Sequence, residues 1–255
     1  MKRIFLPNLK TWSDAIAPAV LVVGDPARAT QAAERLEGST EVSRFREYHV
    51  YSGRFDGVPV TVASHGVGSA GATVCFEELA RAGVRTIVRA GTCGGLQPEV
   101  QAGDIVVATG AVREDGVSPR LVPLAFPAIA DTALMAALER AAEQAGVEVR
   151  RGIVCTHDVF YPSPLFGPTW EVWHKSGVVA IEMELAPLLI VAALHRIRAA
   201  GIFVADGNVL TAARDMSDYR PEQEKVEQAK ERMLDIALQA LAEAPQESAV
   251  AKEGN

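Results

Sequence analysis

Residues 84–96 read V-R-T-I-V-R-A-G-T-C-G-G-L. The short, apolar and β-branched run at residues 86–88 is typical of a strand buried on both faces of a parallel sheet. Arg89 follows it, and the glycine-rich residues 90–95 predict a tight turn where the backbone approaches a ligand closely. A buried guanidinium needs an anionic partner, so Arg89 beside the Thr92 hydroxyl indicates an anion site, most simply phosphate. The alternative is a structural arginine that pairs with an internal carboxylate.

Strands, glycine turns and helices alternate on both sides of this stretch. The apolar run at residues 19–23 ends at Gly24 and leads into a helix predicted at 29–36, with Arg28 in the turn between them. We expect further strands within 45–63 (a hairpin), 104–108, 152–156, 178–184 and 201–208, and helices at 72–82, 130–144, 185–196 and 221–242. This order predicts one α/β domain over residues 1–244, with a central mixed, mostly parallel β-sheet flanked by helices on both faces, and a flexible tail at 245–255.

Composition limits the class of protein. The chain has 255 residues, of which 49% are hydrophobic and 22% charged, as in an ordinary soluble domain. A net charge of -7 argues against a nucleic-acid partner. The three cysteines have no metal-binding spacing and indicate a reducing compartment. Without a signal-like start or a long apolar run, we expect a cytoplasmic protein that does not enter a membrane.

Polar residues gather where the predicted strands end. They are Gly24 and Arg28, Arg89 and Thr92, Glu182 and Glu184, and Asp206. The cations and the Thr92 hydroxyl suit a phosphate oxyanion, whereas Glu184 suits the adjacent hydroxyls of a sugar. Burial would raise the pKa of Asp206 and equip it to protonate a leaving group. Taken singly, Glu182 has a structural alternative as the partner of an internal arginine, and Asp206 as part of an Asx-type turn.

Four motifs together resemble the nucleoside phosphorylase-I family, which holds hexameric purine nucleoside phosphorylases and uridine phosphorylases. The motifs are G-D-P-A-R at 24–28, H-G-V-G at 65–68, R-A-G-T-C-G at 89–94 and E-M-E at 182–184. The resemblance extends from about Pro18 to the final helix. Residues 64–79, 112–115 and 204–207 look most like the purine nucleoside phosphorylases of malaria parasites.

The resemblance implies a role for individual residues. Phosphate would be bound by Gly24, Arg28, Arg89 and Thr92, together with Arg46 from a neighbouring subunit. Ribose would be held by Met183, by Glu184 and by Asn8 of a neighbour, in the place where the family usually has a histidine. The base pocket would be lined by Val67, Cys93, Gly94, Phe160 and Ile181, with Phe160 stacking on the base. Asp206 would be the acid that protonates or hydrogen-bonds N7 of a departing purine.

The implied reaction is the reversible, phosphate-dependent cleavage of purine ribonucleosides or deoxyribonucleosides to free base and pentose 1-phosphate. The resemblance also implies a homohexamer built from three dimers, and no metal or organic cofactor. Uridine phosphorylases place a Gln and an Arg where this chain has Pro164 and Phe166, which favours a purine, although Thr92 is the residue they prefer. A uridine phosphorylase, a nucleoside hydrolase and a catalytically silent nucleoside-binding protein remain alternatives. Arg214 is a candidate to assist Asp206.

Overall fold

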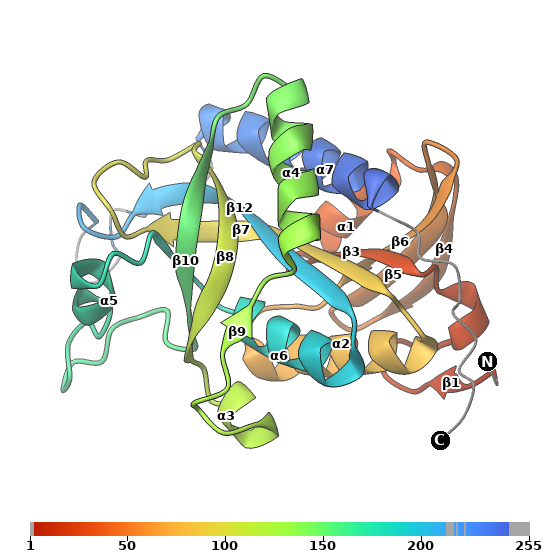
Figure 1. The fold of residues 1–255 in the computed structure, drawn as a ribbon, viewed down its shortest axis with the longest axis horizontal. Coiled ribbons are helices and arrows are strands. Elements are labelled where there is room, and N and C mark those ends of the chain that lie inside the picture. The colour runs from red at the N-terminus through yellow and green to blue at the C-terminus, as the bar shows by residue number, and fades with distance from the viewer. Residues whose placement is uncertain (1–2, 213–216, 218, 222, 245–255) are drawn as a thin grey trace.

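The computed structural model describes residues 3–212, 217, 219–221 and 223–244 (Figure 1). Arg214 and the expected tail at 245–255 therefore lie outside the described residues. The main sheet follows the order β11 (Ala180–Glu182), β10 (Val149–His157), β8 (Ile105–Glu114), β12 (Arg198–Asn208), β7 (Thr86–Gly95), β3 (Ala19–Val23), β6 (Val58–Ser64), β5 (Tyr48–Phe55) and β4 (Glu37–Phe45). Strand β9 (Ala128–Ile129) pairs with β8, and β1 (Phe5–Leu6) pairs separately with β2 (Thr11–Trp12).

The sheet is mixed and mostly parallel, as predicted. Pairs β11–β10, β10–β8, β12–β7, β7–β3 and β3–β6 are parallel, whereas β8–β12, β6–β5 and β5–β4 are antiparallel. Strand β11 also pairs with β7, so that β7, β12, β8, β10 and β11 form a closed ring. All five residues of β3 are buried, because this strand is covered on both faces.

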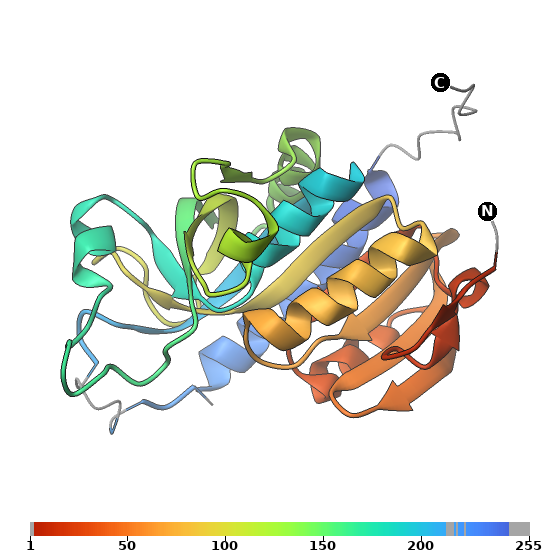
Figure 2. The ribbon, with the colours of Figure 1, turned by 90° about the horizontal axis from the view of Figure 1, so that it is seen from below.

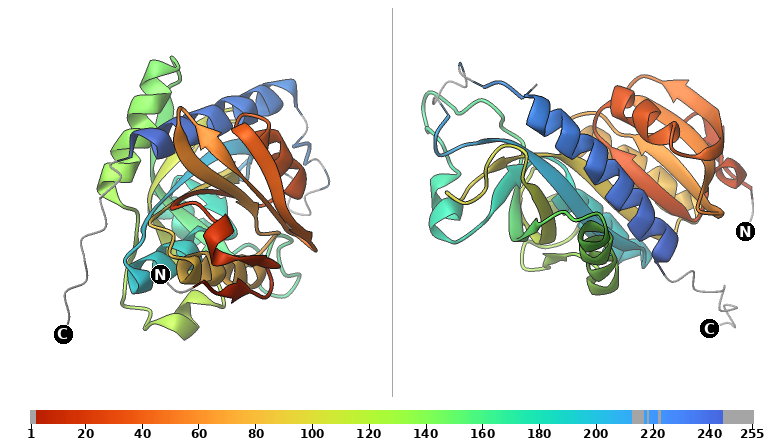
Figure 3. Two further views of the ribbon diagram at one scale, coloured as in Figure 1. Left: turned by 90° about the vertical axis from the view of Figure 1, so that its right-hand side faces the viewer. Right: turned by 90° about the horizontal axis from the view of Figure 1, so that it is seen from above.

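Helices cover both faces of the sheet. Helices α4 (Thr132–Gln144) and α7 (Glu224–Glu243) pack together on one face, as the view from above shows (Figure 3). Helices α2 (Ser69–Ala82) and α6 (Leu185–His195) lie side by side on the other face (Figure 2). Helix α1 (Pro26–Ala33) packs against β3, β5 and β6. The short helices are η1 (Ser13–Ala15), α3 (Ser118–Leu121), which contacts α6, and α5 (Glu171–Lys175).

Two expectations about local structure are wrong. Strand β7 does not turn after Arg89 but continues through Gly95, paired with β12 along its length. A side chain on Gly91 would collide with Nη1 of Arg89, so this glycine provides space for the guanidinium rather than a turn. Helix α1 begins at Pro26, three residues before the expected start, because the Asp25 carboxylate accepts a hydrogen bond from the Ala27 N–H and caps it.

Strand β4 was not expected from the sequence. Its residues are mostly exposed and polar, and they do not alternate with apolar ones. An edge strand of this kind has no buried face to impose a two-residue period.

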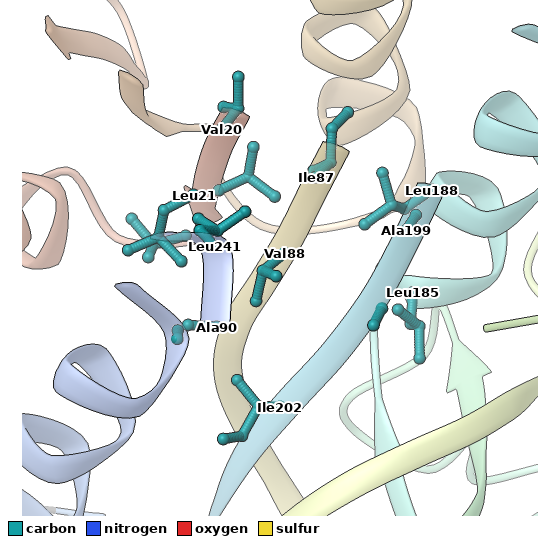
Figure 4. Packing of buried hydrophobic residues seen from close by; sticks show 14 of the residues in the cluster. Val20, Leu21, Ile87, Val88, Ala90, Leu185, Leu188, Ala199, Ile202 and Leu241 are labelled. Atoms are coloured by element: carbon teal, nitrogen blue, oxygen red, sulfur yellow. The ribbon is translucent and has the colours of Figure 1, made fainter. Parts of the chain in front are cut away.

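The core lies between the sheet and the two pairs of helices. Figure 4 shows side chains of β3, β7 and β12 with Leu185 and Leu188 of α6 and Leu241 of α7, all of them buried. Helix α6 is apolar nearly all round because it is enclosed by α2 and the sheet.

Leu188→Ala is expected to lower the free energy of unfolding by about 2–5 kcal/mol, since Leu188 is fully buried and its loss leaves a cavity. Denaturant titration measures this change. Leu194→Ala on the same helix is the matched control, because Leu194 is 49% exposed, and it should change the free energy of unfolding by no more than about 0.5 kcal/mol. Equal effects of the two substitutions would contradict this packing.

Candidate active site

A cavity of about 640 Å³ lies at the ends of β7, β11 and β12, between the start of α1 and the loop after β10. It is lined by thirteen of the residues predicted from the sequence, namely Gly24, Arg28, Val67, Arg89, Thr92, Cys93, Gly94, Phe160, Ile181, Glu182, Met183, Glu184 and Asp206. The segments after β10 and after β12 come together at this end of the molecule (Figure 2), where the rings of Phe160 and Tyr219 meet edge-on at 5.7 Å.

Arg46 and Asn8 do not line this cavity. Arg46 lies in the turn between β4 and β5 with a φ of 53°, and its guanidinium is 5.3 Å from the ring centroid of Phe45. The Asn8 side-chain amide donates a hydrogen bond of 2.6 Å to Glu78 Oε1. The contribution of Arg46 and Asn8 to the site of a neighbouring subunit therefore stays a prediction.

Arg89 is almost completely buried and connects the carboxylates to the cavity. Its Nη2 donates to Glu184 and lies 3.4 Å from Glu182 Oε2. Its Nε and Nη1 are buried and find no hydrogen-bond partner among the described residues. Burial opposes the charge, but the two carboxylates outweigh it and raise the pKa of Arg89. Internal carboxylates thus occupy one nitrogen of Arg89, as the structural interpretation of the sequence requires. Two buried donors have no partner among the described residues, and their binding of an anion stays a prediction.

Glu182 holds the backbone at the start of α6. It accepts hydrogen bonds from the N–H groups of Glu184 and Leu185, each at 2.9 Å, and one of 2.5 Å from the Thr156 hydroxyl. These contacts satisfy backbone donors that the first turn of a helix leaves free. Burial raises the pKa of Glu182, and Arg89 only partly offsets this effect. Glu182 therefore has mainly a structural role, close to the alternative given by the sequence.

Glu184 presents its carboxylate to the cavity. The Gly68 N–H donates a hydrogen bond of 2.5 Å to Oε1, and Arg89 pairs with Oε2. Burial alone would raise the pKa of Glu184, but Arg89, His65 and the Gly68 N–H together lower it. Glu184 is therefore ionised at neutral pH and acts as a hydrogen-bond acceptor only.

Asp206 reaches the cavity because of a bulge in β12. Ala205 pairs with Cys93 and Gly207 pairs with Gly94, so Asp206 is the extra residue between them. A bulge of this kind redirects a side chain and is frequent beside functional sites. Burial raises the pKa of Asp206, although hydrogen bonds from Tyr219 and Thr92 and the charge of Lys230 act in the opposite direction.

Arg28 supplies a second cation from the first turn of α1. It lines the cavity, and the charges of Asp25, Glu227 and Asp206 act on it. Burial, and to a smaller extent the neighbouring charge of Arg89, lower its pKa, while nearby carboxylates act the other way. Two partly desolvated cations at one cavity are an arrangement that a bound anion stabilises.

The remaining walls are largely apolar. Val67 is 80% exposed and Phe160 is 43% exposed, and both line the cavity together with Ile181 and Phe166. Exposed apolar side chains around a concavity are typical of a site for a flat organic ligand. Burial raises the pKa of the Cys93 thiol, so this residue is a neutral contact rather than a nucleophile.

The family profile described as the phosphorylase superfamily matches residues 18–242. The chain belongs to this superfamily. It is 38% identical over 203 residues to a purine nucleoside phosphorylase of Plasmodium falciparum, covering 79% of this chain and 83% of that protein. It is 36% identical over 210 residues to a uridine phosphorylase of Treponema pallidum, covering 79% and 81%. The crystal structure of purine nucleoside phosphorylase from Toxoplasma gondii in complex with immucillin-H is similar, with a TM-score of 0.89 and 35% identity over 95% of this chain and 97% of that chain.

Sequence reasoning missed several residues that line the cavity of this superfamily member, among them His157, Trp170 and Tyr219. Tyr219 lines the cavity and donates a hydrogen bond of 2.7 Å to Asp206 Oδ2. No periodicity or motif in the sequence marks Tyr219. Within the described residues there is neither a cluster of three or more metal-ligating side chains nor a helix long and apolar enough to cross a membrane.

Proposed function

We propose that this phosphorylase-superfamily protein is a purine nucleoside phosphorylase. One observation carries the proposal: Arg89, whose buried Nε and Nη1 have no partner among the described residues, lines the same cavity as Asp206, whose pKa is raised by burial. An anion and a leaving group that needs a proton therefore have complementary partners in one space. The reaction is the reversible exchange of the base of a purine ribonucleoside or deoxyribonucleoside for inorganic phosphate.

In this mechanism Arg28 and Arg89 hold phosphate beside the hydroxyl of Thr92. A phosphate oxygen forms a bond to C1′ as the bond from C1′ to N9 breaks, and the electron pair of that bond passes to the base. Glu184 accepts hydrogen bonds from the ribose hydroxyls and fixes the sugar over the phosphate. Asp206 gives its proton to N7, an effect typically worth about 10²- to 10⁴-fold in rate. Holding the two substrates in register supplies much of the remainder.

The preference for a purine rests on the chemistry of the walls. Phe160, Ile181 and Phe166 are apolar and line the cavity, so they offer nothing to the polar edge of uracil. Uridine phosphorylase is the second candidate, because relatives of both kinds have similar identity to this chain. Thr92 also supports this second candidate, because uridine phosphorylases favour a threonine at this position.

The oligomer and the co-substrate belong to the same proposal. Arg46 and Asn8 lie outside the cavity of their own chain, and they would complete the site of a neighbour in a homohexamer of three dimers. Inorganic phosphate would be the co-substrate, with no metal or organic cofactor, and the enzyme would act in the cytoplasm without a nucleic-acid or membrane partner.

Release of base from inosine, guanosine, adenosine and uridine, with and without phosphate, tests the function. We expect purine release that depends on phosphate, because the nucleophile must occupy the place between Arg28 and Arg89. Cleavage of uridine alone would indicate the second candidate. Turnover in phosphate-free buffer would indicate a hydrolase, and nucleoside binding without turnover would indicate a silent binding protein.

A further inference from the structure

Tyr219 connects the acid to the loop after β10. Its hydroxyl donates a hydrogen bond of 2.7 Å to Asp206 Oδ2, and its ring meets Phe160 edge-on at 5.7 Å. Asp206 comes from the bulge in β12, whereas Phe160 comes from the loop after β10. Tyr219 thus occupies a point where two separate parts of the site meet, and it also lines the cavity.

We propose that Tyr219 is a positioning residue for Asp206: its hydroxyl holds Oδ2, so that Oδ1 is the oxygen that carries the proton to the leaving base. The inference rests on the proposed function and adds a residue to it. A carboxyl group on a short side chain can rotate about its last bond, and one fixed oxygen removes that freedom. Delivery of a proton to one ring nitrogen depends on such alignment.

The same hydrogen bond affects the charge of the acid. A hydroxyl that donates to a carboxylate favours its ionised form, so Tyr219 acts against the burial that raises the pKa of Asp206. The other groups that face this pair are Thr92 and Cys93 from β7, Arg28 from α1 and Lys230 from α7. All of them remain when only the hydroxyl is removed.

Removing the hydroxyl should therefore lower the maximal rate but raise the pH at which activity is lost. The acid loses its alignment, and the maximal rate falls. The pKa of Asp206 rises further, and because the protonated acid is the active form, activity persists to higher pH before Asp206 ionises. A tyrosine that only packs against Phe160 would produce neither effect, since phenylalanine retains the ring.

The test is Tyr219→Phe, with kcat and KM measured across pH for the purine nucleoside that the wild type cleaves fastest. We expect a kcat about 10-fold lower at the optimum and an unchanged KM for phosphate. We also expect an alkaline limb shifted upward by about one pH unit, as the loss of one hydrogen bond to a charged group implies. Dividing the variant rate by the wild-type rate at each pH cancels the ionisation of phosphate itself.

Tyr161→Phe is the matched control. Tyr161 also contacts Phe160, with ring centroids 5.0 Å apart, but it is 69% exposed and does not line the cavity. Its substitution should leave the rate and the pH profile unchanged. In an Asp206→Asn background, Tyr219→Phe should have little further effect, because its target can no longer donate a proton as an acid.

Three outcomes would overturn the role of Tyr219. One is a Tyr219→Phe variant with the wild-type rate and alkaline limb, and another is a further 10-fold loss in the Asp206→Asn background, which would place its action elsewhere. Both leave the phosphorylase function intact, because the wild type still cleaves nucleosides. A wild type that cleaves no nucleoside overturns the proposed function, and the role of Tyr219 with it.

Discussion

Arg89→Lys is expected to lower kcat/KM for phosphate by about 10²- to 10³-fold, the usual effect of removing donors aimed at a developing or bound oxyanion. In the structure Nη2 of Arg89 is used by Glu184, and the buried Nε and Nη1 have no partner among the described residues. Lysine keeps a positive charge beside Glu182 and Glu184. It lacks the planar guanidinium, whose several N–H donors can bind these carboxylates and phosphate at the same time. Initial-rate measurements over a range of phosphate concentrations give the change.

Lysine is preferred to a neutral residue at this position. A neutral substitution would leave Glu182 and Glu184 as buried, unpaired carboxylates, which typically costs about 3–5 kcal/mol of stability and would confuse unfolding with lost binding. Arg35→Lys is the matched control, because Arg35 also pairs with two carboxylates, Glu231 and Asp235, but does not line the cavity. Wild-type phosphate kinetics in a folded Arg89→Lys variant would contradict the phosphate site.

The sequence predicts the strands that are buried on both faces and is less informative where tertiary contacts decide. The apolar runs at 19–23 and 86–88 form β3 and the start of β7, because uninterrupted apolar residues fit a covered parallel strand. The predicted end of β7 is wrong, because a glycine can indicate either a turn or a place where another group packs closely against the backbone. At Gly91 the Arg89 side chain occupies the space, and this contact is visible only in three dimensions.

The sequence predicts those residues of the candidate site that follow from the positions of the strands. Arg89, Glu184 and Asp206 come from three strands or their ends, and the topology brings them to one cavity. The bulge that directs Asp206 inward has no sequence signal, because it depends on the register with β7. The roles predicted for Arg46 and Asn8 require contacts between subunits, which one chain does not contain.

Asp206→Asn should reduce kcat/KM for a purine nucleoside such as inosine by about 10²- to 10⁴-fold, the range expected for the loss of a general acid. Asparagine has nearly the same shape and can still accept the hydrogen bond from Tyr219, so the cavity is retained while the proton is lost. Because burial raises the pKa of Asp206, the wild type should lose activity on the alkaline side as this acid ionises. The variant should lack that limb, which a pH series of kcat/KM will show.

A purine nucleoside methylated at N7 separates proton donation from every other function of Asp206. Its base leaves as a neutral species without receiving a proton, so Asp206→Asn should have little effect on its cleavage by phosphate. Wild-type and variant enzymes should then differ strongly with inosine and only slightly with the methylated substrate. Equal losses with both substrates would mean that Asp206 binds or shapes the site, and the protonation step proposed for it would be wrong.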